Sequence, residues 1–181
     1  MGQGMAHHLT GLTEAPHKGR LSRPQLAGLI VIPLAAILFQ VYVPRFLTFL
    51  AYLELPLLVT VYFSLVRNSP SAGVLFGAAV GLAQDSLSQN PLGMFGIVKT
   101  LVGYFAGSFS QRFAADNPWF RVALSFFFYV FHQFFYWVLS RALLGEAVNF
   151  DFQQVLVFAT LNAAVAAPLY RMLDKLRVAG I

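Results

Sequence analysis

The sequence predicts an all-α polytopic membrane protein, folded as a compact bundle of six transmembrane helices. Hydrophobic residues make up 58% of the 181-residue chain and charged residues only 10%, whereas soluble domains carry about 25% charged residues. Several apolar runs approach the ~20 residues that a helix needs to cross a ~30 Å hydrocarbon core. A water-soluble fold of this size could not cover so much apolar surface.

Composition also excludes several classes of function. The chain has no cysteine, which removes disulfides, thiolate nucleophiles and Cys-ligated metals. Its formal charge of +5 fits lysines and arginines at the ends of membrane spans, and no motif that reads RNA or DNA is present. We therefore expect membrane lipid, and not nucleic acid, around this protein.

The two ends of the chain are expected to be short tails. Residues 1–25 are polar and lack a signal-peptide cleavage site, which predicts a cytoplasmic N-terminal tail. Residues 174–181 are predicted to be a cytoplasmic C-terminal tail, and residues 26–176 the transmembrane domain. Three histidines of the first tail have no carboxylate or cysteine beside them, so a solvated tail is favoured over a metal site; they are His7, His8 and His17.

Six apolar runs predict the spans. Pro33 in the first is tolerable because neighbouring helices can satisfy the freed carbonyl, and the second is interrupted near its midpoint by Glu54 and Pro56. The fifth is the most aromatic and is long enough to tilt. The expected spans cover residues 26–43, 46–66, 71–87, 92–113, 119–144 and 152–173.

Glycines recur every four residues in the third run, at Gly73, Gly77 and Gly81, and the fourth run has a similar pair, Gly103 and Gly107. On a helix, this spacing produces a smooth stripe that another backbone can approach closely. We expect these glycines to be helix-packing or partner-contact positions.

The distribution of basic residues predicts the orientation. With a cytoplasmic amino terminus, nine of the twelve lysines and arginines fall on the cytoplasmic side, Arg45 and Arg141 fall outside, and Lys99 lies within the membrane. This bias follows the positive-inside rule. Both termini are then cytoplasmic, and the connection between the third and fourth spans faces outward.

That connection belongs to a polar, glycine-punctuated segment, residues 81–100. Asp85 precedes a turn that contains Pro91 and Gly93, and Gly96 and Lys99 follow. Asp85 alone reads as ordinary loop chemistry at the end of a helix. Its combination with Pro91, Gly93, Gly96 and Lys99 favours a more specific role, and we expect Pro91, Gly93 and Gly96 also to be helix-packing or partner-contact positions.

Lys99 lies about seven residues into the fourth span, or ~10 Å at 1.5 Å per residue. Its side chain can snorkel part of that distance, but an internal counterion is favoured, with Asp85 and Glu54 as the candidates. Three roles stay open: a structural ion pair, a contact surface for another membrane protein, and a ligand or proton path.

Other polar residues are expected at membrane depth on different helices, namely Glu54, His132, Gln133 and Asn162. They can converge on one cavity, although interhelical hydrogen bonding is the simpler role for the amides. His132, among aromatics, is more typical of a satisfied buried histidine than of a ligand.

Signatures of enzymes are missing: there is no HExxH, GxSxG, Walker loop or paired-carboxylate motif. We therefore predict no catalytic residue, no metal site and no cofactor. An intramembrane enzyme with Asp85 or Glu54 as general base stays the least favoured reading.

The segment from Gly81 resembles the bacterial rod shape-determining protein MreD family, and so do the size, the span count and the short loops of the chain. The matching positions are Gly81–Asp85, Pro91–Gly93, Gly96, Lys99–Leu101 and Gly103–Tyr104. The resemblance implies a non-catalytic inner-membrane scaffold of cell-wall elongation that binds the bitopic protein MreC. MreB, a RodA-type glycosyltransferase and a penicillin-binding transpeptidase are the implied indirect partners.

The resemblance also implies an architecture similar to the substrate-binding membrane subunits of energy-coupling-factor vitamin transporters. A small-solute binding subunit is therefore the alternative function. It would place Glu54, Lys99, His132 and Asn162 around a pocket that opens outward.

Overall fold

The computed structural model describes residues 23–88, 91–113, 117–145 and 149–178. Within these ranges the chain forms six α-helices and two short 3₁₀ helices, with no strand. The all-α prediction is confirmed at this level. Most of the expected N-terminal tail, with His7, His8 and His17, lies outside the described residues, as do residues 179–181.

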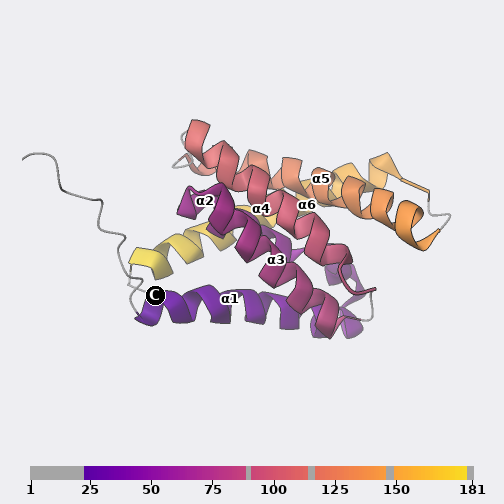
Figure 1. Cartoon of the computed structure of the whole chain (residues 1–181), viewed down its shortest axis with the longest axis horizontal. Coiled ribbons are helices and arrows are strands. Elements are labelled where there is room, and N and C mark those ends of the chain that lie inside the picture. Colours follow the sequence, from indigo (N-terminus) through magenta and orange to yellow (C-terminus); the bar gives the residue numbers. More distant parts are fainter. Residues whose placement is uncertain (1–22, 89–90, 114–116, 146–148, 179–181) are drawn as a thin grey trace, which may run out of the picture.

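The helices run α1 (Arg23–Tyr42), α2 (Leu55–Arg67), α3 (Pro70–Leu87), α4 (Met94–Arg112), α5 (Pro118–Leu144) and α6 (Phe152–Val178). The 3₁₀ helices η1 (Val43–Arg45) and η2 (Thr48–Tyr52) lie between α1 and α2. Figure 1 shows α1 along one edge of the bundle and α5 along the other, with α2, α3 and α4 between them, while α6 starts beside α5 and ends near the start of α1.

Local sequence explains several helix boundaries. Proline occupies an early position of α3 and α5, where its missing N–H has no helical partner to lose. The preceding Asn117 accepts a 3.0 Å hydrogen bond from the amide of Trp119. Asn68 and Gly145, both with positive φ, end α2 and α5.

The second predicted span, residues 46–66, is not one continuous α-helix. Its first part forms η2, and α2 begins only at Leu55, directly after Glu54 and with Pro56 in its first turn. Proline is well suited to a helix start and poorly suited to a helix interior. The helix that remains has 13 residues, or about 20 Å.

Four stretches of the described chain are long and apolar enough to cross a membrane: Ala27–Arg45, Leu50–Arg67, Pro118–Leu144 and Phe152–Arg177. The chain is therefore a multi-pass membrane protein. The more polar α3 and α4 are not among them. The beginning of α1 and the end of α6 line the same hollow, through Gly28 and Arg177, so these two helix ends lie at the same end of the bundle.

α3 and α4 pack with their backbones in near contact. A Cβ at Gly73 would overlap the carbonyl of Gly103, and one at Gly77 would overlap the carbonyl of Lys99. Gly81 faces the Phe95 carbonyl in the same way. Glycine is the residue that such a separation requires, because any side chain would push the two backbones apart.

The same stripe continues to the other end of the helix pair. A Cβ at Gly107 would lie 2.7 Å from the carbonyl oxygen of Ser69, at the beginning of α3. A Cβ at Gly96, by contrast, would meet side chains, those of Leu82 and Asp85, and not the backbone of α3. Close packing therefore extends along α3 from its first turn to Gly81.

Substitution of Gly77 by alanine tests this packing. In an isolated helix the change would stabilise by up to ~1 kcal/mol. Here we expect a loss of roughly 1–3 kcal/mol, because the methyl group meets the Lys99 backbone. Thermal unfolding in detergent measures the effect, with Ala79→Val, an exposed position of the same helix, as the control. An unchanged or raised Tm for Gly77→Ala would contradict the close approach.

Candidate functional site

The Lys99 side chain has no exposed surface, and three groups surround its ammonium. The Nζ atom lies 3.7 Å from Glu54 Oε2 and 3.4 Å from His132 Nε2. It also lies 4.4 Å from the centre of the Phe95 ring, at cation–π distance. A buried ammonium requires such neighbours, because an isolated charge in an apolar interior is very costly.

Glu54 is the acid within ion-pair distance of Lys99, and the unwound start of α2 places it there. Its backbone amide donates a 2.9 Å hydrogen bond to Asn162 Oδ1 on α6. The Asn162 amide nitrogen in turn donates to the carbonyl oxygens of Tyr52 and Phe158, at 2.8 and 2.9 Å. Asn162 therefore fixes the segment that carries Glu54.

Asp85, the other candidate counterion, has a different task. It lies in the last turn of α3 and is 1% exposed. Its carboxylate accepts hydrogen bonds from the amides of Gly93, Phe95 and Gly96, at 2.9 to 3.1 Å. These amides begin α4, whose first N–H groups have no helical partner. Asp85 thus caps α4 from the neighbouring helix and sets its N-terminus, one turn before Lys99.

The turn between α3 and α4 depends on Gly93. This residue has φ +98°, a conformation that residues with a side chain rarely adopt, and its amide donates to Asp85. Pro91 is exposed. Residues 89 and 90, which complete the predicted turn, lie outside the described residues.

The structure therefore brings together Glu54, Lys99 and His132, with Asn162 bound to the backbone of Glu54. The rings of His132 and Phe95 stack at 5.8 Å with an interplanar angle of 12°. Gln133 does not contact these groups directly: it donates to the hydroxyl of Tyr129, which in turn donates to the carbonyl of Tyr52. Within the described residues, no cluster of three or more acidic or histidine side chains could hold a metal ion.

A small pocket adjoins this cluster, and apart from Glu54 its lining residues were not predicted from sequence. It has a volume of about 350 Å³ and is lined by residues from α1, the η1–η2 region, α3 and α4, including Gln40, Arg45, Glu54, Gln84 and Phe95. The feature of the sequence that could have indicated this pocket is the presence of two polar residues, Gln40 and Gln84, inside apolar runs. Their importance depends on contacts between helices, which sequence alone does not give.

A second polar cluster, at the other end of the bundle, was likewise not predicted from sequence. Arg121 Nη1 donates to both carboxylate oxygens of Asp174 at 3.0 Å. Tyr62 donates to the same carboxylate at 2.8 Å. Arg121, one of the basic residues expected on the cytoplasmic side, ties α5 to α6 through Asp174, which also accepts a hydrogen bond from Tyr62 of α2.

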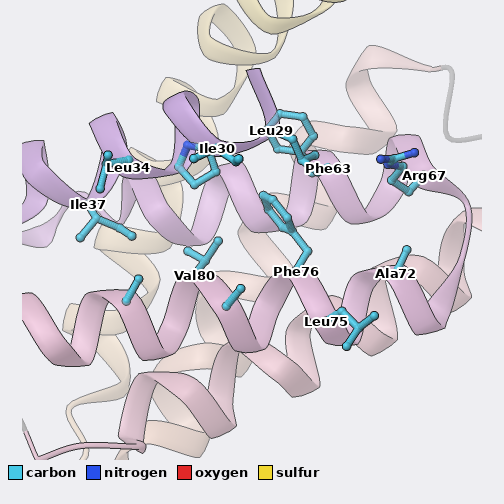
Figure 2. A pocket seen from close by; sticks show the side chains of 13 residues that line it. Leu29, Ile30, Leu34, Ile37, Phe63, Arg67, Ala72, Leu75, Phe76 and Val80 are labelled. Carbon is cyan, nitrogen blue, oxygen red and sulfur yellow. The ribbon is translucent and has the colours of Figure 1, made fainter. Parts of the chain in front are cut away.

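A larger, apolar groove runs between α1 and α3. Its volume is about 610 Å³, and Figure 2 shows side chains of α1 on one wall and of α3 on the other, with Arg67 at one end. The lining residues are Leu29, Ile30, Pro33, Leu34, Ile37, Phe63, Arg67, Ala72, Leu75, Phe76, Ala79, Val80 and Ala83.

These features define a helical, multi-pass membrane protein that buries an ion pair in its interior and presents an apolar groove on its side. The family model of the rod shape-determining protein MreD matches residues 22–178, nearly the whole chain. The chain belongs to the MreD family, which confirms the resemblance seen in the sequence. No curated protein and no solved structure matches the chain.

Charge removal tests the ion pair. We expect Glu54→Gln and Lys99→Met each to destabilise the protein by about 3–5 kcal/mol, because each leaves one buried charge without its partner. The double variant should lose much less than the sum of the two. Unfolding in detergent of the four proteins gives the coupling energy; additive losses would exclude a direct interaction.

Asp85→Asn tests the cap of α4. Asparagine replaces one acceptor oxygen by an NH₂ group that faces backbone donors, so we expect a loss of about 1–3 kcal/mol. Hydrogen exchange should become faster at the amides of Phe95 and Gly96. Asp151→Asn is the control, since Asp151 accepts a single bond from the amide of Gln154 at the exposed beginning of α6. Unchanged exchange in α4 would contradict the capping role.

Proposed function

We propose that the protein is a non-catalytic scaffold of the cell-wall elongation complex in the bacterial inner membrane, where it binds MreC and supports peptidoglycan synthesis and cell shape. The match to the MreD family over residues 22–178 carries this proposal. The buried polar groups are consistent with it. Asp85 caps α4, Lys99 pairs with Glu54, and Asn162 binds the backbone of Glu54, and these are structural tasks.

We further propose that all six helices cross the membrane, with both termini in the cytoplasm. An even number of crossings agrees with the common position of the start of α1 and the end of α6. The excess of basic residues at that end supports the orientation. α3 and α4 enter the bilayer although they are less apolar, because their polar side chains Gln84, Asp85 and Lys99 are buried inside the bundle.

The groove between α1 and α3 is the surface that we assign to the transmembrane helix of MreC. Large apolar side chains border it, and Ile30 is 58% and Leu75 is 73% exposed. On α3 the lining extends from Ala72 to Ala83, about 17 Å along the helix axis. Small alanines in this wall let another helix approach closely, and a groove several turns long suits a helix of a bitopic partner.

The small-solute binding function has weaker support. Of its four residues, Lys99, His132 and Asn162 have almost no exposed surface, and Glu54 is the one that lines the adjoining pocket.

Copurification tests the groove. We expect Ile30→Trp and Leu75→Trp to lower the recovery of MreC with this protein by roughly tenfold, because each indole would occupy space needed by the partner helix. Val157→Trp is the matched control, since Val157 on α6 is 59% exposed and lies outside the groove. Equal recovery with all three variants would exclude the groove as the MreC site, and loss with the control alone would move the site to α6.

Failure of the unsubstituted protein to recover MreC in mild detergent, while another membrane partner is recovered in the same extract, would remove the main support for the scaffold.

A further inference from the structure

The pocket beside Glu54 contains hydrogen-bond acceptors that lack donors. Three buried oxygens of its lining residues, Gln40 Oε1, Glu54 Oε2 and Gln84 Oε1, have no hydrogen-bond partner among the described residues. Buried polar atoms are normally satisfied, and each exception calls for an explanation. Three acceptors around one pocket indicate a ligand that is rich in donors.

The acceptor character of two of these oxygens is well defined. The Gln40 amide nitrogen donates to the carbonyl of Ala51 at 3.2 Å, which directs its NH₂ group to that carbonyl and leaves the oxygen as acceptor. Glu54 Oε2 has Lys99 Nζ at 3.7 Å, beyond the length of a charge-assisted hydrogen bond. The third oxygen belongs to Gln84, which is 2% exposed and therefore also lies in the protein interior.

The net charge of the buried groups near the pocket favours a ligand whose hydrogen-bond donor is a cation. Beside the imidazole of His132, the buried groups on this side of the bundle are two carboxylates, Glu54 and Asp85, and one ammonium, Lys99. When these three groups are ionised they carry one net negative charge. A primary ammonium supplies three N–H donors and neutralises this charge.

The rim of the pocket has the opposite character. Arg45 lines the pocket and is exposed, with its guanidinium 5.2 Å from the centre of the Tyr42 ring. A guanidinium is well suited to bind phosphate. The pocket therefore offers acceptors in its interior and an anion-binding group at its opening.

The opening also lies at the level expected for the membrane surface. It is at the end of α1, where the side chains of Tyr42, Phe46 and Tyr52 are exposed. Aromatic side chains concentrate where hydrocarbon meets the headgroups. Leu87, another lining residue, is exposed on the same rim.

We propose that this pocket binds a zwitterionic group in which a primary ammonium lies a few bonds from an anion, and that its source is the ethanolamine phosphate headgroup of a membrane lipid. The ammonium donates to Gln40, Glu54 and Gln84, and the phosphate binds Arg45. The acyl chains remain in the bilayer.

Lipid competition tests this proposal. The purified full chain is placed in detergent with equal amounts of phosphatidylethanolamine and phosphatidylcholine that have identical acyl chains, and retained lipid is counted by native mass spectrometry. Choline has no N–H donor, so we expect retention of the ethanolamine lipid to exceed that of the choline lipid by roughly tenfold. Equal retention would overturn the proposal.

Variants separate the pocket from a general lipid effect. Gln84→Met removes one acceptor at similar volume, and Arg45→Gln removes the exposed cation; each should reduce the preference to about twofold or less. Gln133→Met, the same change on α5 where the side chain bonds to Tyr129, should leave it unchanged. Arg45→Gln keeps the test decisive if Gln84→Met fails to fold. A preference that survives in the folded variants would overturn the assignment.

A soluble probe distinguishes the two possible sources of the zwitterionic group, which are a lipid headgroup and a free small molecule. O-phosphoethanolamine is added to the protein in phosphatidylcholine alone. A rise in Tm with this probe, in the absence of any preference for the ethanolamine lipid, would assign the pocket to a free zwitterion and overturn the lipid source. Neither result depends on the recovery of MreC.

Discussion

An ammonium without any exposed surface has to be neutralised inside the protein, and Lys99 therefore constrains several other elements of the bundle. Its counterion, Glu54, belongs to the segment before α2, so that helix has to begin late. The free backbone amide of Glu54 then needs an acceptor, which Asn162 supplies from α6. A single buried charge in this way accounts for the start of α2 and for a polar residue in the middle of α6.

The backbone position of Lys99 is fixed from the other side. Asp85 caps the first turn of α4, and the carbonyl of Lys99 lies against Gly77 of α3. With α4 held so close to α3, the ammonium has little freedom to find another partner. Capping, glycine packing and ion pairing consequently act together to fix Lys99. We expect a substitution that disrupts any of them to weaken the ion pair with Glu54.

Much of this could be predicted from sequence, and the reasons differ between residues. The glycine positions 73, 77 and 81 follow from a period along one helix, whereas the pairing of Gly73 with Gly103 depends on register between two helices. The depth of Lys99 in the fourth span predicts that it needs an acid. The choice between Glu54 and Asp85 required the fold, because Asp85 is closer in the chain and yet serves the backbone of α4.

The polar pocket and the Arg121–Asp174 pair could not be predicted from sequence for the same reason. Each is built from side chains on different helices. A glutamine inside an apolar run looks like a minor exception until its neighbours are known. Local patterns predict helices well, but they do not give the partners of polar side chains.

The 13-residue length of α2 has a further consequence for how the protein relates to its bilayer. A helix of about 20 Å is shorter than a ~30 Å hydrocarbon core, and an exposed helix of that length would force the lipid to thin around it. Most of α2 is enclosed, since Leu57, Leu58, Val59 and Val61 have almost no exposed surface, although Phe63 and Arg67 near its end line the groove. Contacts with the surrounding helices, more than contact with the hydrocarbon, therefore set the depth of Glu54 at the start of α2.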